Sequence, residues 1–221
     1  MKKTVSLPKH LNDAPEKVLN PELDDLKNQR LIFNAAQNGD ANAIAAFADM
    51  GYSLDQKDTQ GWTPLLIAAQ NGHTKAIIAL ATRGCNMNAQ SKKGSTALFF
   101  AAQNGHTKAI IALVARGATL DKQNNKGETP IFIAAQYGHT KVVQFLAVSR
   151  ADLDKQNNRG ETPIFIAALK GHTKVIEILV NNGADAAMAN KKEQTPAFIA
   201  ETMGHKDTLK FLTSVDPCAI S

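Results

Sequence analysis

Five histidines recur at a constant step of 33 residues, each directly after a glycine: His73, His106, His139, His172 and His205. Histidine is the side chain best suited to proton transfer and to metal binding near neutral pH. One histidine per structural unit places neighbouring rings about 8–10 Å apart, the packing distance of helices. Two rings at that separation cannot hold the same metal ion. The spacing therefore argues against a metal site.

The last four residues form a second pattern with chemical meaning. Cys218-Ala219-Ile220-Ser221 has the form of a prenylation box, and a terminal serine favours farnesyl over geranylgeranyl. We therefore predict Cys218 as a lipidation site. A polybasic run and a second acylatable cysteine are both missing just upstream, so a single lipid would give only reversible membrane association. Coincidence is the alternative, and it holds if the protein never meets a prenyltransferase.

Motifs of catalysis are absent from the sequence. It contains no Gly-rich phosphate loop, nucleophile elbow, paired carboxylates or metal-ligand spacing. Cys85 and Cys218 are the only cysteines, so a disulfide framework and a thiolate zinc site are both unsupported, and a reducing, intracellular environment fits better. Cys85 follows a glycine that ends a helix, and we interpret it as a small buried filler. We expect no catalytic residue, no cofactor and no metal.

Composition narrows the class of partner. The formal charge is +5, with a pI of about 9.2, which suits an acidic protein surface and is well short of a dense basic arm. The amino end starts basic but never becomes a continuous apolar stretch, so we expect neither a signal peptide nor a membrane span. We expect an intracellular monomer.

The elements that carry the histidines repeat with the same period. Thr63 has the oxygen to cap a helix, and Pro64 suits the first helical position, where no amide hydrogen is needed. Gly72 then ends this short helix, and a second helix carries apolar residues at helical spacing from Ile77 onward. Five units of this kind are plain, and Ala35-Ala36-Gln37-Asn38-Gly39-Asp40 marks an atypical sixth one before them. None can bury its apolar face alone, so the units must stack.

The sequence resembles the ankyrin-repeat family. The resemblance is carried by Gly61-Trp62-Thr63-Pro64-Leu65, Gly127-Glu128-Thr129-Pro130-Ile131, the Gly-His pairs and Gly183-Ala184-Asp185. It implies an all-α solenoid of about six helix-turn-helix units with hairpin-like loops. It also implies that each repeated histidine ties neighbouring loops together by hydrogen bonds. We divide the chain into an arm (1–20), a repeat domain (21–214, with repeats at about 25–57, 58–90, 91–123, 124–156, 157–189 and 190–214) and a tail (215–221).

Some residues depart from the family pattern. The family usually has histidine after Thr-Pro-Leu, where this chain has Leu66, Phe99, Phe132, Phe165 and Phe198. We expect apolar packing between the layers there. Arg150 and Glu193 stand where the family has glycine, and each costs about 1 kcal/mol if its φ is positive.

Two adjacent units are nearly identical. Residues 120–142 and 153–175 differ only at Lys126/Arg159, Gln136/Leu169 and Tyr137/Lys170. In ankyrin-like proteins these positions line the concave binding face, although drift of exposed residues is an equal explanation.

Transferring the family's binding positions to this sequence gives a candidate surface for a partner protein. Its loop positions are Thr59, Gln60, Trp62, Lys92, Lys93, Ser95, Lys126, Glu128, Arg159, Glu161, Lys191 and Lys192. Its helix positions are Gln70, Asn71, Gln103, Asn104, Gln136, Tyr137, Leu169 and Lys170. Trp62 and Tyr137 are the aromatic candidates for anchors, with a packed loop residue as the alternative for Trp62.

The sequence supports a protein-binding scaffold first. With the prenylation box, the repeats resemble effectors that intracellular bacteria deliver into eukaryotic cells. The alternatives are a nucleic-acid-binding module that uses the basic loop tips and a substrate-recruiting arm of an enzyme complex. Too few residues remain outside the repeats for a catalytic domain.

Overall fold

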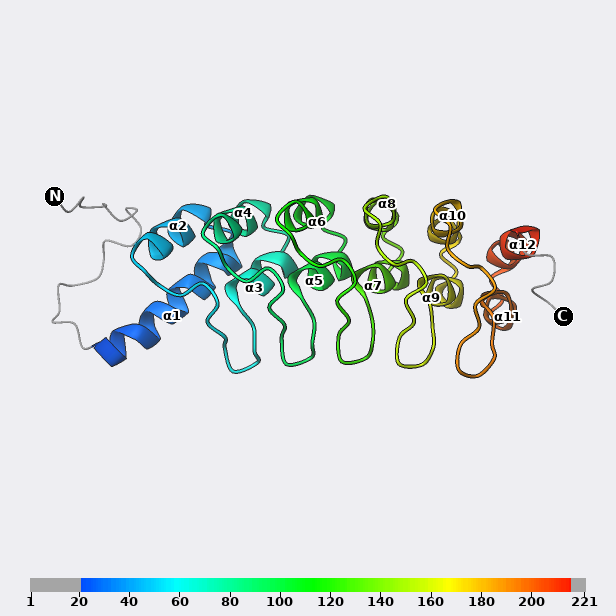
Figure 1. The fold of residues 1–221 in the computed structure, drawn as a ribbon, viewed down its shortest axis with the longest axis horizontal. Helices are drawn as coiled ribbons and strands as arrows, with labels where there is room; N and C mark the ends of the chain where they lie inside the picture. The colour runs from blue at the N-terminus through cyan, green and yellow to red at the C-terminus, as the bar shows by residue number, and fades with distance from the viewer. Residues whose placement is uncertain (1–20, 216–221) are drawn as a thin grey trace.

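The computed structural model describes residues 21–215, with side chains from Arg30 onward. This part of the chain consists of twelve α-helices in six consecutive pairs and contains no strand (Figure 1). The all-α solenoid of about six units is therefore confirmed. The arm (1–20) and the prenylation box lie outside the described residues.

The first helix of each pair is called the inner helix and the second the outer helix. The inner helices are α1 (Pro21–Asn38), α3 (Pro64–Gln70), α5 (Ala97–Gln103), α7 (Pro130–Gln136), α9 (Pro163–Lys170) and α11 (Pro196–Thr202). The outer helices are α2 (Ala41–Asp49), α4 (Thr74–Thr82), α6 (Thr107–Val114), α8 (Thr140–Val148), α10 (Thr173–Asn181) and α12 (Lys206–Val215). Each set forms its own row, and a hairpin loop precedes each inner helix from α3 on (Figure 1). No helix of residues 21–215 is long and apolar enough to cross a membrane.

The inner helices begin where the threonines predict. Thr63 Oγ1 accepts a hydrogen bond from the Leu66 amide at 3.3 Å, and Thr129 Oγ1 accepts one from the Phe132 amide at the same distance. Caps of this kind each stabilise a helix by about 1 kcal/mol. They matter here because inner helices of seven or eight residues are too short to be stable alone.

The core consists of thin layers between successive units. Ala134 and Ala167 are completely buried where inner helices meet, and small side chains permit that close approach. The predicted apolar packing is confirmed at four of the five positions, Leu66, Phe99, Phe132 and Phe165. Phe198 on α11 is 48% exposed instead, because no described inner helix follows α11 to cover it.

Three local expectations can be compared directly with the structure. Arg150 (φ 68°) and Glu193 (φ 60°) both adopt positive φ, so the strain predicted at these two residues is present. Cys85 is buried, and burial raises the pKa of its thiol to about 12, which fits an inert filler. The apolar residues expected from Ile77 onward in the second helix include Ile78, whose equivalent one unit later is Ile111, and these two are in contrast 37% and 45% exposed. They point away from the helix pairs.

Candidate protein-binding surface

The repeated histidines join consecutive units. The Nε2 atom of His139 lies 2.9 Å from the carbonyl oxygen of Gln103, and that of His172 lies 3.2 Å from the carbonyl oxygen of Gln136. Because a carbonyl only accepts, Nε2 is the donor in each case. The same bond recurs at His73, His106 and His205. The role in tying neighbouring units is confirmed. Among the side chains that the structure describes, from Arg30 to Val215, there is no cluster of His, Cys, Asp or Glu that could hold a metal ion.

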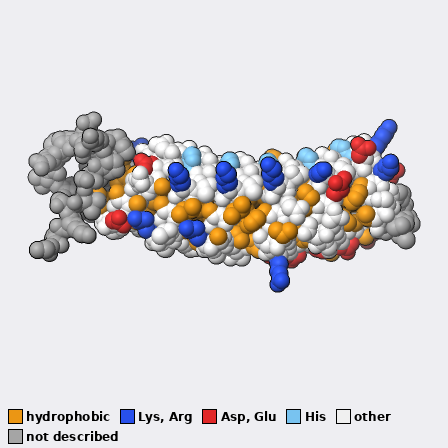
Figure 2. Space-filling view, turned by 90° about the horizontal axis from the view of Figure 1, so that it is seen from above, with side chains coloured by type: hydrophobic (Ala, Val, Ile, Leu, Met, Phe, Trp, Pro, Cys, Tyr) orange, Lys and Arg blue, Asp and Glu red, His pale blue; other side chains and the backbone are white. Residues whose placement is uncertain are grey.

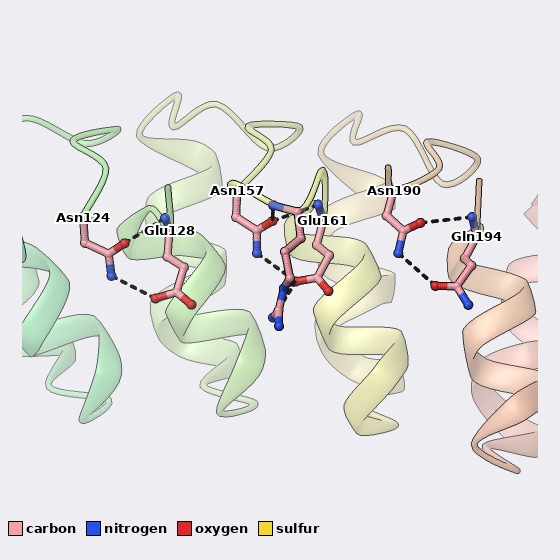
Figure 3. A network of polar contacts seen from close by, with 7 residues as sticks. Asn124, Glu128, Asn157, Glu161, Asn190 and Gln194 are labelled. Carbon is pink, nitrogen blue, oxygen red and sulfur yellow. Dashed lines mark hydrogen bonds and ion pairs between the residues drawn. The ribbon is translucent and has the colours of Figure 1, made fainter. Parts of the chain in front are cut away.

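A network of asparagines shapes the hairpin loops (Figure 3). Asn124 Oδ1 accepts the amides of Lys126 and Glu128 at 2.9 and 3.0 Å, and its Nδ2 donates to Glu128 Oε2 at 2.8 Å. Asn157 repeats this arrangement with Glu161, and Asn190 does so with Gln194. These bonds fix each loop from inside, so its tip residues project from a defined backbone.

Successive loops are also bonded to one another. The Asn125 amide donates to the Lys93 carbonyl at 3.0 Å, and the Asn158 amide donates to the Lys126 carbonyl at 2.9 Å. One more bond of this kind joins each flanking pair of loops, with Lys92 and Lys191 as donors. The loop tips therefore form a continuous edge, and their basic side chains stand in a row along it.

Two hollows lie between this edge and the inner helices. The first, of about 440 Å³, reaches from the ends of α5 and α7 to the loop tips. Its lining includes seven predicted residues: Lys93, Ser95, Gln103, Lys126, Glu128, Gln136 and Tyr137. The second, of about 360 Å³, lies between α9, α11 and their loops, and its predicted lining residues are Arg159, Glu161, Leu169, Lys191 and Lys192. We call the residues that line the two hollows the groove face.

The structure separates the predicted surface residues by exposure. Those exposed to solvent are Thr59, Gln60, Gln70, Lys92, Lys93, Asn104, Lys126, Tyr137, Arg159, Lys170, Lys191 and Lys192. Those half-buried are Trp62, Asn71, Gln103, Glu128, Gln136 and Leu169. Ser95 and Glu161 are buried, at 5% and 7% exposure. We therefore remove these two from the candidate surface.

Several of these side chains already have partners within the chain. Glu161 Oε2 accepts from Asn157 at 2.8 Å and from Arg159 Nη2 at 2.9 Å, so its charge is engaged inside the loop. Trp62 stacks on Phe100 of the next unit, with ring centroids 4.4 Å apart. It is therefore a packed loop residue, which was the alternative to its being an anchor. Tyr137, 50% exposed, remains the aromatic candidate for an anchor.

The sequence did not predict every residue of the groove face. Asn125 and Asn158 lie at its rim, while Phe100, Ile133 and Ile199 contribute apolar surface to its floor. Asn125 and Asn158 occupy the same position in the near-duplicate units, so the differences between those units do not point to them. The apolar residues have the pattern of ordinary core residues, and only the stacking of units shows that they border a hollow.

Aspartate and asparagine side chains bridge consecutive units in the segments that follow the outer helices. Asp121 Oδ1 accepts the Asp152 amide at 3.0 Å, and Asn88 Oδ1 accepts the Thr119 amide at 2.8 Å one unit earlier. Burial raises the pKa of Asp121 above its ordinary 3.8; the backbone hydrogen bond opposes this, and the charge of Asp152 adds to it. The pKa of Asp154, beside Asp185, is raised for the same reasons.

The change Asp121→Asn should stabilise the protein at neutral pH. Because the pKa of Asp121 is raised in the folded state, folding is favoured while its carboxyl group is protonated, below its ordinary pKa. This contribution to stability is lost as the pH rises through the folded-state pKa. Asparagine keeps the acceptor, as Asn88 shows, and removes the repulsion from Asp152. We expect a gain of about 0.5 kcal/mol at pH 7, the scale of exposed charge interactions, which disappears at about pH 3, below the ordinary pKa of 3.8. Urea unfolding of parent and variant at both pH values measures it, and a gain that is equal at the two values would contradict the assignment.

Comparison with known proteins agrees with this architecture. A family model described as ankyrin repeats (3 copies) matches residues 9–91, 76–157 and 147–220. Among solved structures, the chain is similar to the crystal structure of EF0377, an ankyrin repeat protein, with 27% identity and a TM-score of 0.78. That similarity covers 84% of this chain and 97% of the other. No match was found among curated proteins. Since the family matches extend over nearly all the stacked helix pairs, the chain belongs to the ankyrin-repeat family.

Proposed function

We propose that the protein is a scaffold that binds a segment of a partner protein along its groove face. Ankyrin repeats generally mediate protein–protein interactions, and proteins built from them are typically not catalysts. The observation that carries the proposal is that ten of the eighteen candidate residues that remain line just two hollows between the loop edge and the inner helices. Scattered surface drift would not concentrate them there.

The chemistry of the groove face favours an acidic partner segment with apolar side chains. Lys92, Lys93, Lys126, Lys191 and Lys192 are exposed at the loop tips. Of the acidic residues beside them, Glu128 and Glu161 hydrogen-bond to asparagines of their own loops, and Glu193 is exposed. The rim therefore presents mainly positive charge, while the floor offers apolar surface to a side chain that enters the hollow.

Truncation of the exposed tyrosine tests this site. Tyr137→Ala should weaken capture of the partner about tenfold or more, because exposed aromatic residues near the centre of an interface carry much of its affinity. The measurement is quantitative retention of partners from a eukaryotic lysate on the immobilised protein. Val148→Ala is the matched control, because Val148 is 61% exposed but lies on the outer helix α8 of the same unit. Equal retention by all three proteins would rule out Tyr137 as an anchor.

We further propose that the scaffold works inside a eukaryotic cell, as a farnesylated protein that divides between cytosol and membrane. The support is the Cys218-Ala219-Ile220-Ser221 sequence, which resembles a farnesyltransferase substrate. An acidic partner held on the groove face would then be brought to the membrane. An effector that bacteria deliver into host cells would combine these features.

Modification of Cys218 has a direct test. Expression in eukaryotic cells should add one farnesyl mass, and part of the protein should sediment with membranes, since one lipid chain gives reversible attachment. Intact-mass analysis and fractionation of parent and Cys218→Ser variant measure both effects. An unmodified parent protein that divides between cytosol and membrane like the variant would show that the prenylation-box sequence is a coincidence.

A further inference from the structure

A row of lysines crosses the outer helices. Lys75, Lys108, Lys141 and Lys174 are each the second residue of their helix, on α4, α6, α8 and α10. All four are exposed, and none forms an ion pair with another side chain of residues 30–215. Figure 2, seen from the side of the outer helices, shows basic side chains evenly spaced along this face. The four central outer helices thus present one unpaired positive charge per unit.

Local electrostatics does not favour lysine at these positions. The amino end of a helix carries partial positive charge and stabilises acidic rather than basic side chains. The first turns of α4, α6, α8 and α10 contain no acidic residue to compensate, and among these helices only α10 has one further along, Glu177. Four residues that break the same local rule, with no ion-pair partner in the described part of the chain, suggest a partner outside it.

Apolar side chains stand beside the lysines. Ile78 and Ile111 follow Lys75 and Lys108 by one helical turn, so each pair lies on the same face of its helix. Both isoleucines are exposed, by 37% and 45%. Figure 2 shows hydrophobic side chains next to the basic row. We call these two isoleucines and the four lysines the lysine ridge.

We propose that the lysine ridge docks on an anionic membrane surface. Mobile lipid headgroups adapt to any spacing of cations, and the isoleucines reach the apolar boundary below them. The outer helices α4, α6, α8 and α10 lie in a nearly straight row, which suits a flat surface (Figure 1).

A single-stranded nucleic acid fits less well. Its bases bind by stacking on exposed aromatic side chains. The large exposed hydrophobic residues of the described outer helices are Ile78, Ile111, Val148 and Val215, with no aromatic ring among them.

The ridge and the groove face do not compete. The ridge belongs to the outer helices, whereas the hollows lie between the inner helices and the loop edge. Figure 1 places the outer helices and the loops on opposite sides of the inner helices. A protein docked by its ridge would therefore keep the groove face open to a partner, and this proposal does not depend on the one for the groove face.

Vesicle binding of the unlipidated protein tests the ridge separately from Cys218. The full chain carrying Cys218→Ser is mixed with vesicles of phosphatidylcholine alone or with about one-third phosphatidylserine, the anionic lipid of cytoplasmic leaflets. Each lysine near such a surface adds about fivefold to partitioning. Replacement of Lys75, Lys108, Lys141 and Lys174 by glutamine should therefore lower binding by about 600-fold, nearly three orders of magnitude. High salt should also weaken vesicle binding by the protein that keeps all four lysines.

A charge-matched control distinguishes the ridge from net charge. Lys92, Lys93, Lys126 and Lys192 lie on the loop edge, and their replacement by glutamine also removes four charges. This control should retain vesicle binding, and the ridge variant should be at least as stable to heat as the parent. Three outcomes would overturn the proposal: equal loss in both variants, no preference for phosphatidylserine, or ridge-dependent retention on single-stranded RNA without vesicle binding.

Discussion

Replacing Gly138 by alanine should lower the free energy of unfolding by about 2–4 kcal/mol, whereas Gly117→Ala should cost only about 1–2 kcal/mol. Both glycines have positive φ, 72° and 83°, so alanine is strained at either position. They differ in what surrounds them. A Cβ on Gly138 would lie 2.9 Å from two atoms of the His172 ring, while one on Gly117 would meet nothing within 4 Å.

The ring of His172 cannot move aside without loss. Its Nε2 donates to the Gln136 carbonyl at 3.2 Å, and this bond links α7 to the following unit. A shift that relieves the contact with an added Cβ would stretch or break the bond, at a cost of about 1 kcal/mol. The difference between the two glycine variants thus measures how firmly the histidine is held.

Chemical denaturation of the two variants gives both free energies. Two further proteins, His172→Ala alone and Gly138→Ala combined with His172→Ala, provide the control because they lack the ring that the new methyl group contacts. The excess cost of Gly138→Ala over Gly117→Ala should largely vanish when it is measured in the His172→Ala background. Equal costs at Gly138 and Gly117 in the parent protein would show that backbone strain alone matters.

Enlarging the contacts between inner helices should have an effect of similar size. Ala134 on α7 and Ala167 on α9 are completely buried, and α7 packs against both α5 and α9. Leucine at either position must push the helices apart or adopt a strained rotamer, which costs about 1–3 kcal/mol. Because stability in a repeat protein is a sum over neighbouring interfaces, the loss should also broaden the unfolding transition.

The control for this change is Ala115→Leu, at the exposed carboxyl end of α6. It adds the same side chain where solvent can accommodate it, and its effect should stay within about 0.5 kcal/mol. Thermal unfolding followed by circular dichroism compares the three variants with the parent. Unchanged midpoints for Ala134→Leu and Ala167→Leu would mean that the layers between inner helices are looser than the burial of these alanines indicates.

The repeat could be predicted from the sequence because every unit carries its own start and stop signals. Thr63 caps a helix through atoms three residues away, and Gly72 follows the end of that helix, so both signals are local. The groove face was harder to predict because exposure depends on neighbouring units. Trp62 belongs to one loop, yet Phe100 of the next unit covers it.

Buried charge was missed for a related reason. Glu161 looked like a surface residue by type, but an asparagine four positions earlier and the guanidinium of Arg159 enclose its carboxylate. Ile78 shows the reverse error, since helical spacing placed it on an apolar face that turned out to be exposed. Periodicity identifies which residues share a face, but only packing decides what covers that face.

The backbone hydrogen bonds between loop tips all run in the same sense, from an amide of the later loop to a carbonyl of the earlier one. Their peptide dipoles therefore add along the solenoid axis, much as they do along a helix. This gives the edge a polarity, with its positive end toward the amino-terminal loops. A partner segment can lie along the edge in either of two orientations, and these differ in energy. The favoured orientation places the acidic residues of the segment toward the amino-terminal loops.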